Sequence, residues 1–296
     1  MSENEIHALI KLIDDPDEGI YSQVRNRIVS LGEPVVQALE TAWESEDLGD
    51  LFRNRIEDIL HSIHLDITYQ RLKRWREAGA VDLLEGALAV SRYRYPELDE
   101  YRVKSKLAAL RQDIWLELND QLTAFEKVRV FNHIFFTIHG FHGNKRNYHA
   151  PQNSYINEVL ETRKGNPLSL AVIYQVIAEE LGLPLRGVNL PNHFVLAWLD
   201  EEGQGPGELG HPGVLFYVNA FRQGDILGRN EILEFLGKLE LPAKEEFFKP
   251  CSNLEIVRRQ LNNLLNSYQK QNDSERVEDL RHLISALAEP EVQAGS

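Results

Sequence analysis

Most hydrophobic positions along this chain recur at helical spacing, but one stretch is apolar on nearly every side. It runs from Leu168 to Leu181, and few polar residues interrupt it. A helix without a polar face is typically buried at the centre of its domain. Asn166 offers a capping side chain, Pro167 fixes φ at the first helical position, and Gly182 follows the last apolar residue. The pattern therefore predicts a buried central helix with defined ends.

Two stretches after this helix have the composition of β-strands. His193 opens a run of β-forming residues that ends at Trp198, and a second run ends at Asn219. A glycine-rich segment over 200–212 joins them, so we expect an antiparallel pair, with a further strand starting at Val188. A buried helix beside a small antiparallel sheet indicates an α+β fold that is predominantly helical.

The flanking stretches predict further helices. Apolar stripes before residue 77 indicate four short helices in two pairs, with a break at Asp15–Pro16. These pairs resemble a HEAT-type repeat, and because a free-standing solenoid needs about three repeats, we expect a helical cap. Ser252 with Glu255 fits a capping box that opens a helical pair resembling one tetratricopeptide unit. The expected division is a helical N-terminal segment (1–76), a core (77–245) and a C-terminal helical pair (246–296).

Charge and composition exclude several classes of protein. The chain has 296 residues and a net charge of -14, and nucleic-acid binding needs a basic face, so we expect no nucleic-acid partner. No window reaches the roughly 18 apolar residues of a membrane span, and the acidic, amphipathic N-terminus does not resemble a signal peptide. The single cysteine, Cys251, leaves no disulfide framework. We therefore expect a soluble, cytoplasmic protein.

Three histidines precede the central helix in a polar, glycine-containing segment: His139, His142 and His149. Zinc sites combine such histidines with cysteine or carboxylate ligands at recurring spacing, or place two of them four residues apart on a helix. Neither pattern occurs in this segment. We therefore expect no metal ion, and no other residue pattern calls for a cofactor.

A long ordered run of motifs occupies residues 140–198. It contains N-S-Y-I-N, R-K-G-N-P, L-S-L, L-G-L-P and P-N-H-F in that order, after L-L-E-G-A-L-A-V-S-R-Y-R-Y-P-E-L-D. The run resembles the SirB-type branch of the transglutaminase-like superfamily. The resemblance covers about residues 80–225 and continues weakly into the C-terminal helices, whereas the N-terminal segment lies outside it. It implies a papain/transglutaminase-like core, a buried helix on a small antiparallel sheet, flanked by helical-repeat-like segments.

The resemblance also implies where a catalytic site would lie. Active enzymes of this superfamily have a cysteine at the start of the buried helix, a histidine at the next strand, and an Asp or Asn on the strand after it. The helix N-terminus and the histidine lower the pKa of the thiol, and the third residue orients the imidazole. By order, the resemblance assigns His193 and Asn219 to the second and third positions. The cysteine position falls at or near Pro167, with Ser169 as the nearest hydroxyl, and Cys251 lies far beyond.

The absent cysteine favours a non-catalytic protein, a pseudoenzyme that acts as an interaction or binding module for a protein or peptide. Its net negative charge favours basic partners. The alternative is a hydrolase or acyl-transferase that uses Ser169, His193 and Asn219, although a serine needs a well-aligned base. A third class is a small-molecule or peptide site in the remaining cleft. A structural role for His193, bonded to Asn219, competes with a binding role. Candidate binding residues are Asn166, Asn153, Arg163 and Tyr148.

Overall fold

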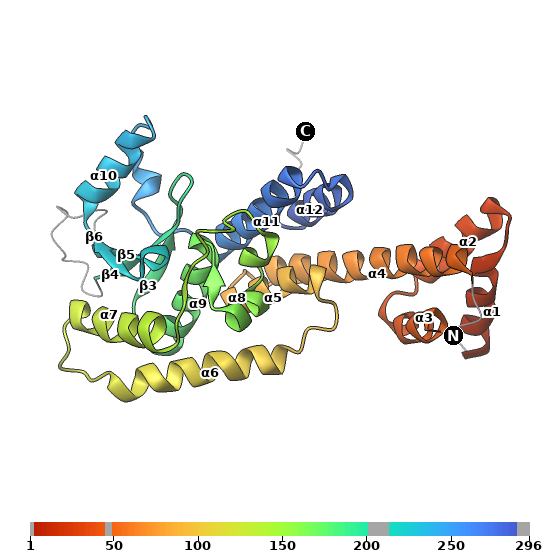
Figure 1. Ribbon diagram of the computed structural model, residues 1–296, viewed down its shortest axis with the longest axis horizontal. Helices are drawn as coiled ribbons and strands as arrows, with labels where there is room; N and C mark the ends of the chain where they lie inside the picture. The colour runs from red at the N-terminus through yellow and green to blue at the C-terminus, as the bar shows by residue number, and fades with distance from the viewer. Residues whose placement is uncertain (1–2, 45–48, 201–212, 289–296) are drawn as a thin grey trace, which may run out of the picture. The chain divides into compact units, whose positions relative to one another are not determined.

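A computed structural model describes residues 3–44, 49–200 and 213–288 (Figure 1). The chain divides into two compact units, Met1–Arg74 and Trp75–Ser296. The three-part division expected from the sequence stays a prediction. Among the described residues, no helix is both long and apolar enough to span a bilayer.

The first unit is helical. The break expected at Asp15–Pro16 separates its first two helices, and Asp17 caps the second by accepting the backbone N–H groups of Gly19 and Ile20. Buried isoleucines and leucines from each helix form its core. The guanidinium of Arg55 is buried there because it donates hydrogen bonds to the carbonyl oxygens of Ile13 and Asp15. The helices are α1 (Glu3–Lys11), α2 (Glu18–Val29), α3 (Val36–Trp43) and α4 (Asp50–Glu77), the last of which runs on beyond residue 74.

The second unit combines helices with a small sheet, which confirms the predicted α+β, predominantly helical class. A π-helical turn, His133–Ile138, continues α7, and a 3-10 turn, Pro151–Ser154, precedes α8. The helices are α5 (Leu83–Arg94), α6 (Glu100–Glu117), α7 (Ala124–Asn132), α8 (Ile156–Thr162), α9 (Pro167–Glu180), α10 (Arg229–Lys238), α11 (Asn253–Lys270) and α12 (Ser274–Ala286).

Four strands form one antiparallel sheet in the order β3-β4-β5-β6. The antiparallel pairing expected for the second and third of these is confirmed. Two details differ from the sequence-based prediction: Val188 ends β3 instead of starting a strand, and β4 begins at Val195, after His193. Residues 201–212, which belong to the segment predicted as a glycine-rich turn, lie outside the described residues. The strands are β3 (Leu185–Val188), β4 (Val195–Leu199), β5 (Val214–Asn219) and β6 (Asp225–Leu227), with a separate parallel pair, β1 (His142–Gly143) and β2 (Lys164–Gly165).

Helix α9 is the buried centre of this unit, as its composition predicts. Every residue from Pro167 to Ala178 is buried, and the helix contacts β3, β4, α5, α6, α8 and α11 (Figure 1). Its Tyr174 ring stacks on Phe131 with centroids 3.7 Å apart. Each fully buried large apolar side chain contributes about 1.5–3 kcal/mol, so this packing fixes the position of the helix and of its N-terminus.

Candidate functional site

The N-terminus of α9 is closed by a capping box. Asn166 accepts the backbone N–H of Ser169 at 2.9 Å, and the hydroxyl oxygen of Ser169 accepts the backbone N–H of Asn166 at 3.0 Å. Pro167 occupies the first helical position, where its missing N–H costs nothing. The Ser169 hydroxyl in turn donates to the carbonyl oxygen of Asn153 at 2.6 Å. Ser169 is 2% exposed, so this hydroxyl belongs to the framework of the helix start.

Asn153 holds the neighbouring loop in place. Its side-chain nitrogen donates to the carbonyl oxygens of Asn147 at 2.7 Å and Tyr148 at 3.0 Å, and its side-chain oxygen accepts from Asn144 at 2.8 Å. These bonds use the nitrogen and the oxygen of its amide, and the side chain is only 3% exposed. Asn153 is therefore a supporting residue, and the loop that it supports carries the side chain of Tyr148.

The histidine lies in a tight turn between β3 and β4. The backbone N–H of His193 donates to the carbonyl oxygen of Leu190 at 3.2 Å, with Pro191 second in the turn and Asn192 third, at φ 56°. This is the pattern of a type II turn, and Asn tolerates the positive φ better than most residues do. The turn explains why β4 starts after His193.

Arg259 of α11 fixes this turn from the side. Its guanidinium donates to the carbonyl oxygen of Leu190 at 2.7 Å and to the side-chain oxygen of Asn189, and it lies 5.7 Å from the centroid of the Phe194 ring. A helix beyond the predicted core thus positions the histidine.

Burial favours the neutral form of the His193 imidazole. Burial lowers its pKa below the usual value of 6.5, hydrogen bonding with Asn219 opposes this, and the positive charges of Arg259 and Arg222 lower it further. The ring also lies edge-on to Phe221, with centroids 6.4 Å apart. Asn219, which is 4% exposed, uses its side-chain oxygen to accept the backbone N–H of Arg222 at 3.3 Å. The structure therefore brings together His193 and Asn219, which the resemblance assigned to one site.

The only cysteine is inert in its surroundings. Cys251 donates from Sγ to the carbonyl oxygen of Gly187 at 3.3 Å. Burial, with a smaller effect of Glu255, raises the pKa of its thiol to about 12. The thiolate is the nucleophilic form of cysteine, so at neutral pH this side chain stays a protonated, structural thiol.

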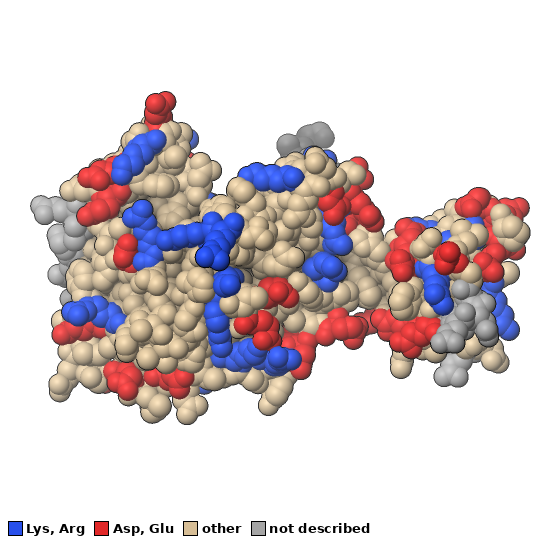
Figure 2. Space-filling model, in the orientation of Figure 1, with Lys and Arg blue, Asp and Glu red and all other residues tan. Residues whose placement is uncertain are grey.

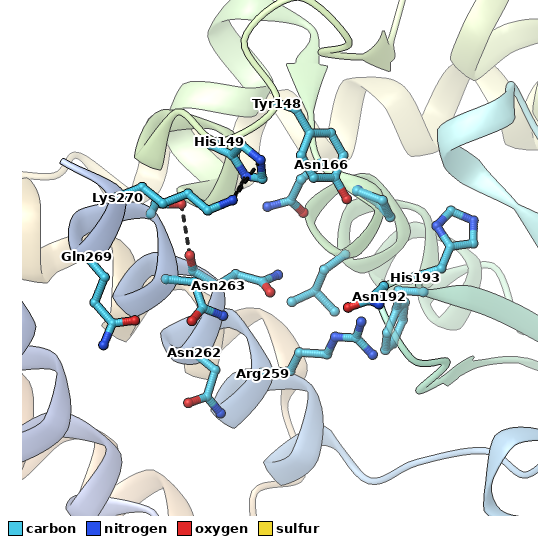
Figure 3. A pocket seen from close by; sticks show the side chains of 15 residues that line it. Tyr148, His149, Asn166, Asn192, His193, Arg259, Asn262, Asn263, Gln269 and Lys270 are labelled. Atoms are coloured by element: carbon cyan, nitrogen blue, oxygen red, sulfur yellow. Dashed lines mark hydrogen bonds between the residues drawn. The ribbon is translucent and has the colours of Figure 1, made fainter. Parts of the chain in front are cut away.

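An open cleft of about 690 Å³ lies beside the N-terminus of α9 (Figure 3). Of the residues that sequence reasoning singled out, Tyr148, Asn166 and His193 line it. Asn153, Ser169, Asn219 and Arg163 are not among its lining residues. The lining is Tyr148, His149, Asn166, Pro167, Leu168, Asn192, His193, Phe194, Arg259, Asn262, Asn263, Asn266, Ser267, Gln269 and Lys270.

Arg163 has a local role. It takes a left-handed conformation, φ 61°, at the C-terminal end of α8. Its guanidinium lies 4.8 Å from the centroid of the Phe141 ring, a cation-π distance. These contacts place Arg163 beside the β1–β2 pair and away from the cleft.

The polar face of α11 forms one whole wall of the cleft and was not predicted from the sequence. This face carries side chains at helical spacing next to the apolar stripe of the same helix. The signal was present in the sequence as Q-L-N-N-L-L-N-S-Y-Q-K, an asparagine-rich polar face. Such faces usually meet solvent, so sequence alone did not distinguish this one. The residues of α11 that line the cleft are Arg259, Asn262, Asn263, Asn266, Ser267, Gln269 and Lys270.

The three histidines of the preceding segment go to separate places. His139 pairs with Asp113 at 2.8 Å, and His142 Nδ1 lies 2.9 Å from the carbonyl oxygen of Gly140. His149 lies at the cleft, where its Nε2 is 2.8 Å from Lys270 Nζ. Within the described parts of the chain, no group of three or more His, Cys, Asp or Glu side chains could hold a metal ion.

Comparison with known proteins identifies the family of this chain. The sequence model of the transglutaminase-like superfamily matches residues 101–262 of this chain. These residues contain α9, the His193 turn and the first part of α11. The UPF0162 protein of Xylella fastidiosa (strain 9a5c) is 31% identical over 222 residues, 69% of this chain and 73% of its own. UPF0162 protein YchA of Escherichia coli (strain K12) is 24% identical over 205 residues, which are 67% of this chain and 71% of YchA.

A shorter match has a different context. F-box only protein 21 of Homo sapiens is 31% identical over 137 residues, which are 45% of this chain and 20% of that protein. The matched segment is thus a small part of a much longer polypeptide. No solved structure matches the chain.

Proposed function

Since the chain belongs to the transglutaminase-like superfamily and has homologues in the UPF0162 family, we propose that it is a non-catalytic member that binds a peptide segment of a partner protein. The binding site is the cleft between the N-terminus of α9, the His193 turn and the polar face of α11. The superfamily fold then serves as a scaffold for recognition.

The hydrogen bonds of Ser169 are the main support for a non-catalytic protein. Its hydroxyl hydrogen goes to the carbonyl oxygen of Asn153 at 2.6 Å, and its oxygen accepts the N–H of Asn166. A catalytic serine instead directs its hydroxyl toward the histidine that removes its proton. Pro167, at the place where we expect the cysteine of the superfamily, has no nucleophilic atom. Cys251 is protonated and bonded elsewhere.

The shape and chemistry of the cleft support binding. Its volume of about 690 Å³ falls in the range of ligand sites, about 300–1,000 Å³. Three asparagine side chains of α11, Asn262, Asn263 and Asn266, line it. Each such amide both donates and accepts hydrogen bonds, as a peptide backbone requires. The match to one-fifth of the longer F-box only protein 21 also fits a segment used as a module.

The alternative function is a hydrolase or acyl-transferase that uses Ser169, His193 and Asn219. The lowered pKa of His193 favours it, because a general base must be unprotonated. However, Ser169 would have to break its bonds with Asn153 and Asn166 to act, and those bonds hold the start of α9. We therefore keep it as the second candidate.

Finer assignments belong to the same proposal. We place the chain in the SirB-type branch of the superfamily and regard α11 with α12 as a tetratricopeptide-like pair, because these helices pack directly on one another. The helices before residue 75 would be a HEAT-like cap. The cytoplasm is the proposed location, in which a lone thiol such as Cys251 stays reduced.

An array of N-acetylated hexapeptides probed with the intact chain tests the proposal. Asn266→Trp places a large ring in the cleft from an exposed helical position, so it should abolish binding. Gln112→Trp makes the same kind of change on the exposed face of α6, which contributes no residue to the cleft, so it should leave binding unchanged. If the native chain and the Asn266→Trp variant bind the peptides of the array equally, the cleft is not the binding site.

A further inference from the structure

We propose that the peptide bound in the cleft is acidic, with carboxylates that pair with Arg259 at one end of the cleft and with Lys270 at the other. This inference rests on the proposed function and specifies its ligand. It reverses the expectation from net charge, because a chain with 46 acidic residues would ordinarily attract basic partners.

The cleft differs in charge from the rest of the chain. Its fifteen lining residues include two permanent cations, Arg259 and Lys270, and no Asp or Glu. The two histidines His149 and His193 add no negative charge. Elsewhere on this unit the charges are mixed: Figure 2 shows Lys and Arg side chains over the middle of one face, with Asp and Glu side chains beside them and at the edges. A local positive field in a net negative protein selects an anionic group at this site.

Neither cation of the cleft is neutralised within the described residues. Arg259 donates to the backbone oxygen of Leu190 and the side-chain oxygen of Asn189, both uncharged. Glu255, four residues earlier on the same helix, instead uses its carboxylate to accept from Ser252. A guanidinium has five donors, so Arg259 keeps donors for a ligand.

Lys270 is placed similarly at the other end of the cleft. Its Nζ lies 2.8 Å from Nε2 of His149, and it forms no ion pair with a carboxylate of the described residues. In Figure 3, Lys270 and His149 lie on one side of the cleft, while Arg259 lies below the His193 turn on the other. A carboxylate at either end of the cleft would therefore meet a positively charged side chain.

The surroundings favour a peptide as the bearer of the carboxylate. Asn262, Asn263 and Asn266 lie between the two cations on α11 and offer paired donors and acceptors. The cleft is larger than one side chain requires. The N-terminus of α9, with Leu168 at its opening, adds the positive end of a fourteen-residue helix dipole.

The test uses the same hexapeptide array with matched triplets that differ only in Glu, Gln or Lys at one position. For the peptides selected, isothermal titration calorimetry with the intact chain gives the dissociation constants. A hydrogen bond to a charged group contributes about 1.5–3 kcal/mol, so the Glu member should bind about tenfold or more tightly than its Gln twin. The preference should weaken as salt is raised.

Variants of Lys270, an exposed side chain, locate the effect. Lys270→Gln should reduce the preference for Glu over Gln severalfold, and Lys270→Arg should keep it. Lys238→Gln removes an equally exposed cation from α10, outside the cleft, and should change nothing. Thermal unfolding of each variant confirms that the fold is retained.

The outcomes separate the two proposals. Peptide binding that Asn266→Trp abolishes, but that shows no preference for Glu, overturns the acidic ligand and leaves the binding module. A preference for Lys, or a Glu preference that Lys270→Gln does not alter, overturns it as well. Absence of any cleft-dependent peptide binding overturns the proposed function itself.

Discussion

The hydroxyl of Ser169 donates a hydrogen bond of 2.6 Å to the backbone carbonyl oxygen of Asn153. This bond ties the start of α9 to the 3-10 turn before α8. The side chain of Asn153 then holds the loop that carries Tyr148, through the carbonyl oxygens of Asn147 and Tyr148. A position that could be taken for a nucleophile thus builds one rim of the cleft.

Ser169→Ala should therefore destabilise the protein without removing a function. The variant leaves the N–H of Asn166 and the carbonyl of Asn153 without this partner in a buried site, so we expect the free energy of unfolding to fall by about 1–3 kcal/mol. Ser285→Ala is the matched control, because the exposed Ser285 hydroxyl bonds the carbonyl of His282 at 2.6 Å. It should cost less than about 0.5 kcal/mol. Urea unfolding measures both, and equal effects would contradict the framework role.

Arg259→Gln should raise the pKa of His193. The arginine charge lowers that pKa in the native protein, although burial is the larger cause. Removing the positive charge reverses part of the decrease in the pKa of His193. Arg259→Lys retains the positive charge and should leave the pKa nearer the native value. NMR titration of the His193 ring protons measures both. A pKa that is unchanged or lower in Arg259→Gln would show that the guanidinium does not act on the imidazole.

The same shift predicts how stability depends on pH. Because the pKa of His193 is lower in the folded state than the usual 6.5, the unfolded chain binds this proton more readily. Stability from this group is fully present above about pH 6.5. It is lost as pH falls through the folded pKa. His193→Gln should flatten the decrease in unfolding free energy between about pH 7 and about pH 5. An unaltered slope would assign the dependence to other groups.

The two possible thiol positions should differ sharply in reactivity. Cys251, with a pKa of about 12, should react slowly with iodoacetamide at neutral pH. Pro167→Cys would place a second thiol at the first position of α9, lining the cleft, where the helix N-terminus lowers a thiol pKa. Peptide mapping by mass spectrometry should find residue 167 modified first. Faster modification of Cys251 would contradict the account of both environments.

Local patterns were enough to predict the fold around α9. The capping residue Asn166, the proline at the first helical position and the continuous apolar run specify a buried helix with a fixed start, as observed. The resemblance to the transglutaminase-like superfamily paired His193 with Asn219, and the two side chains are hydrogen-bonded in the structure. These features depend on residues close in sequence or on strand pairing, which composition indicates well.

The contacts that define the cleft depend on long-range packing. The role of Ser169 is set by Asn153, sixteen residues earlier, and the turn of His193 is held by Arg259 from α11. The polar face of α11 has the pattern of an ordinary solvated surface. Only its packing beside α9 makes Asn262 and Lys270 part of a site.

The most direct test of the account is the fate of an array-selected peptide in the presence of the native chain, Ser169→Ala and Asn266→Trp. Calorimetry should give the same dissociation constant for the native chain and Ser169→Ala, and no binding to Asn266→Trp. Mass spectrometry should recover the peptide intact and Ser169 unmodified. Cleavage of the peptide, or an acyl group on Ser169, that disappears in Ser169→Ala would contradict a non-catalytic binding site.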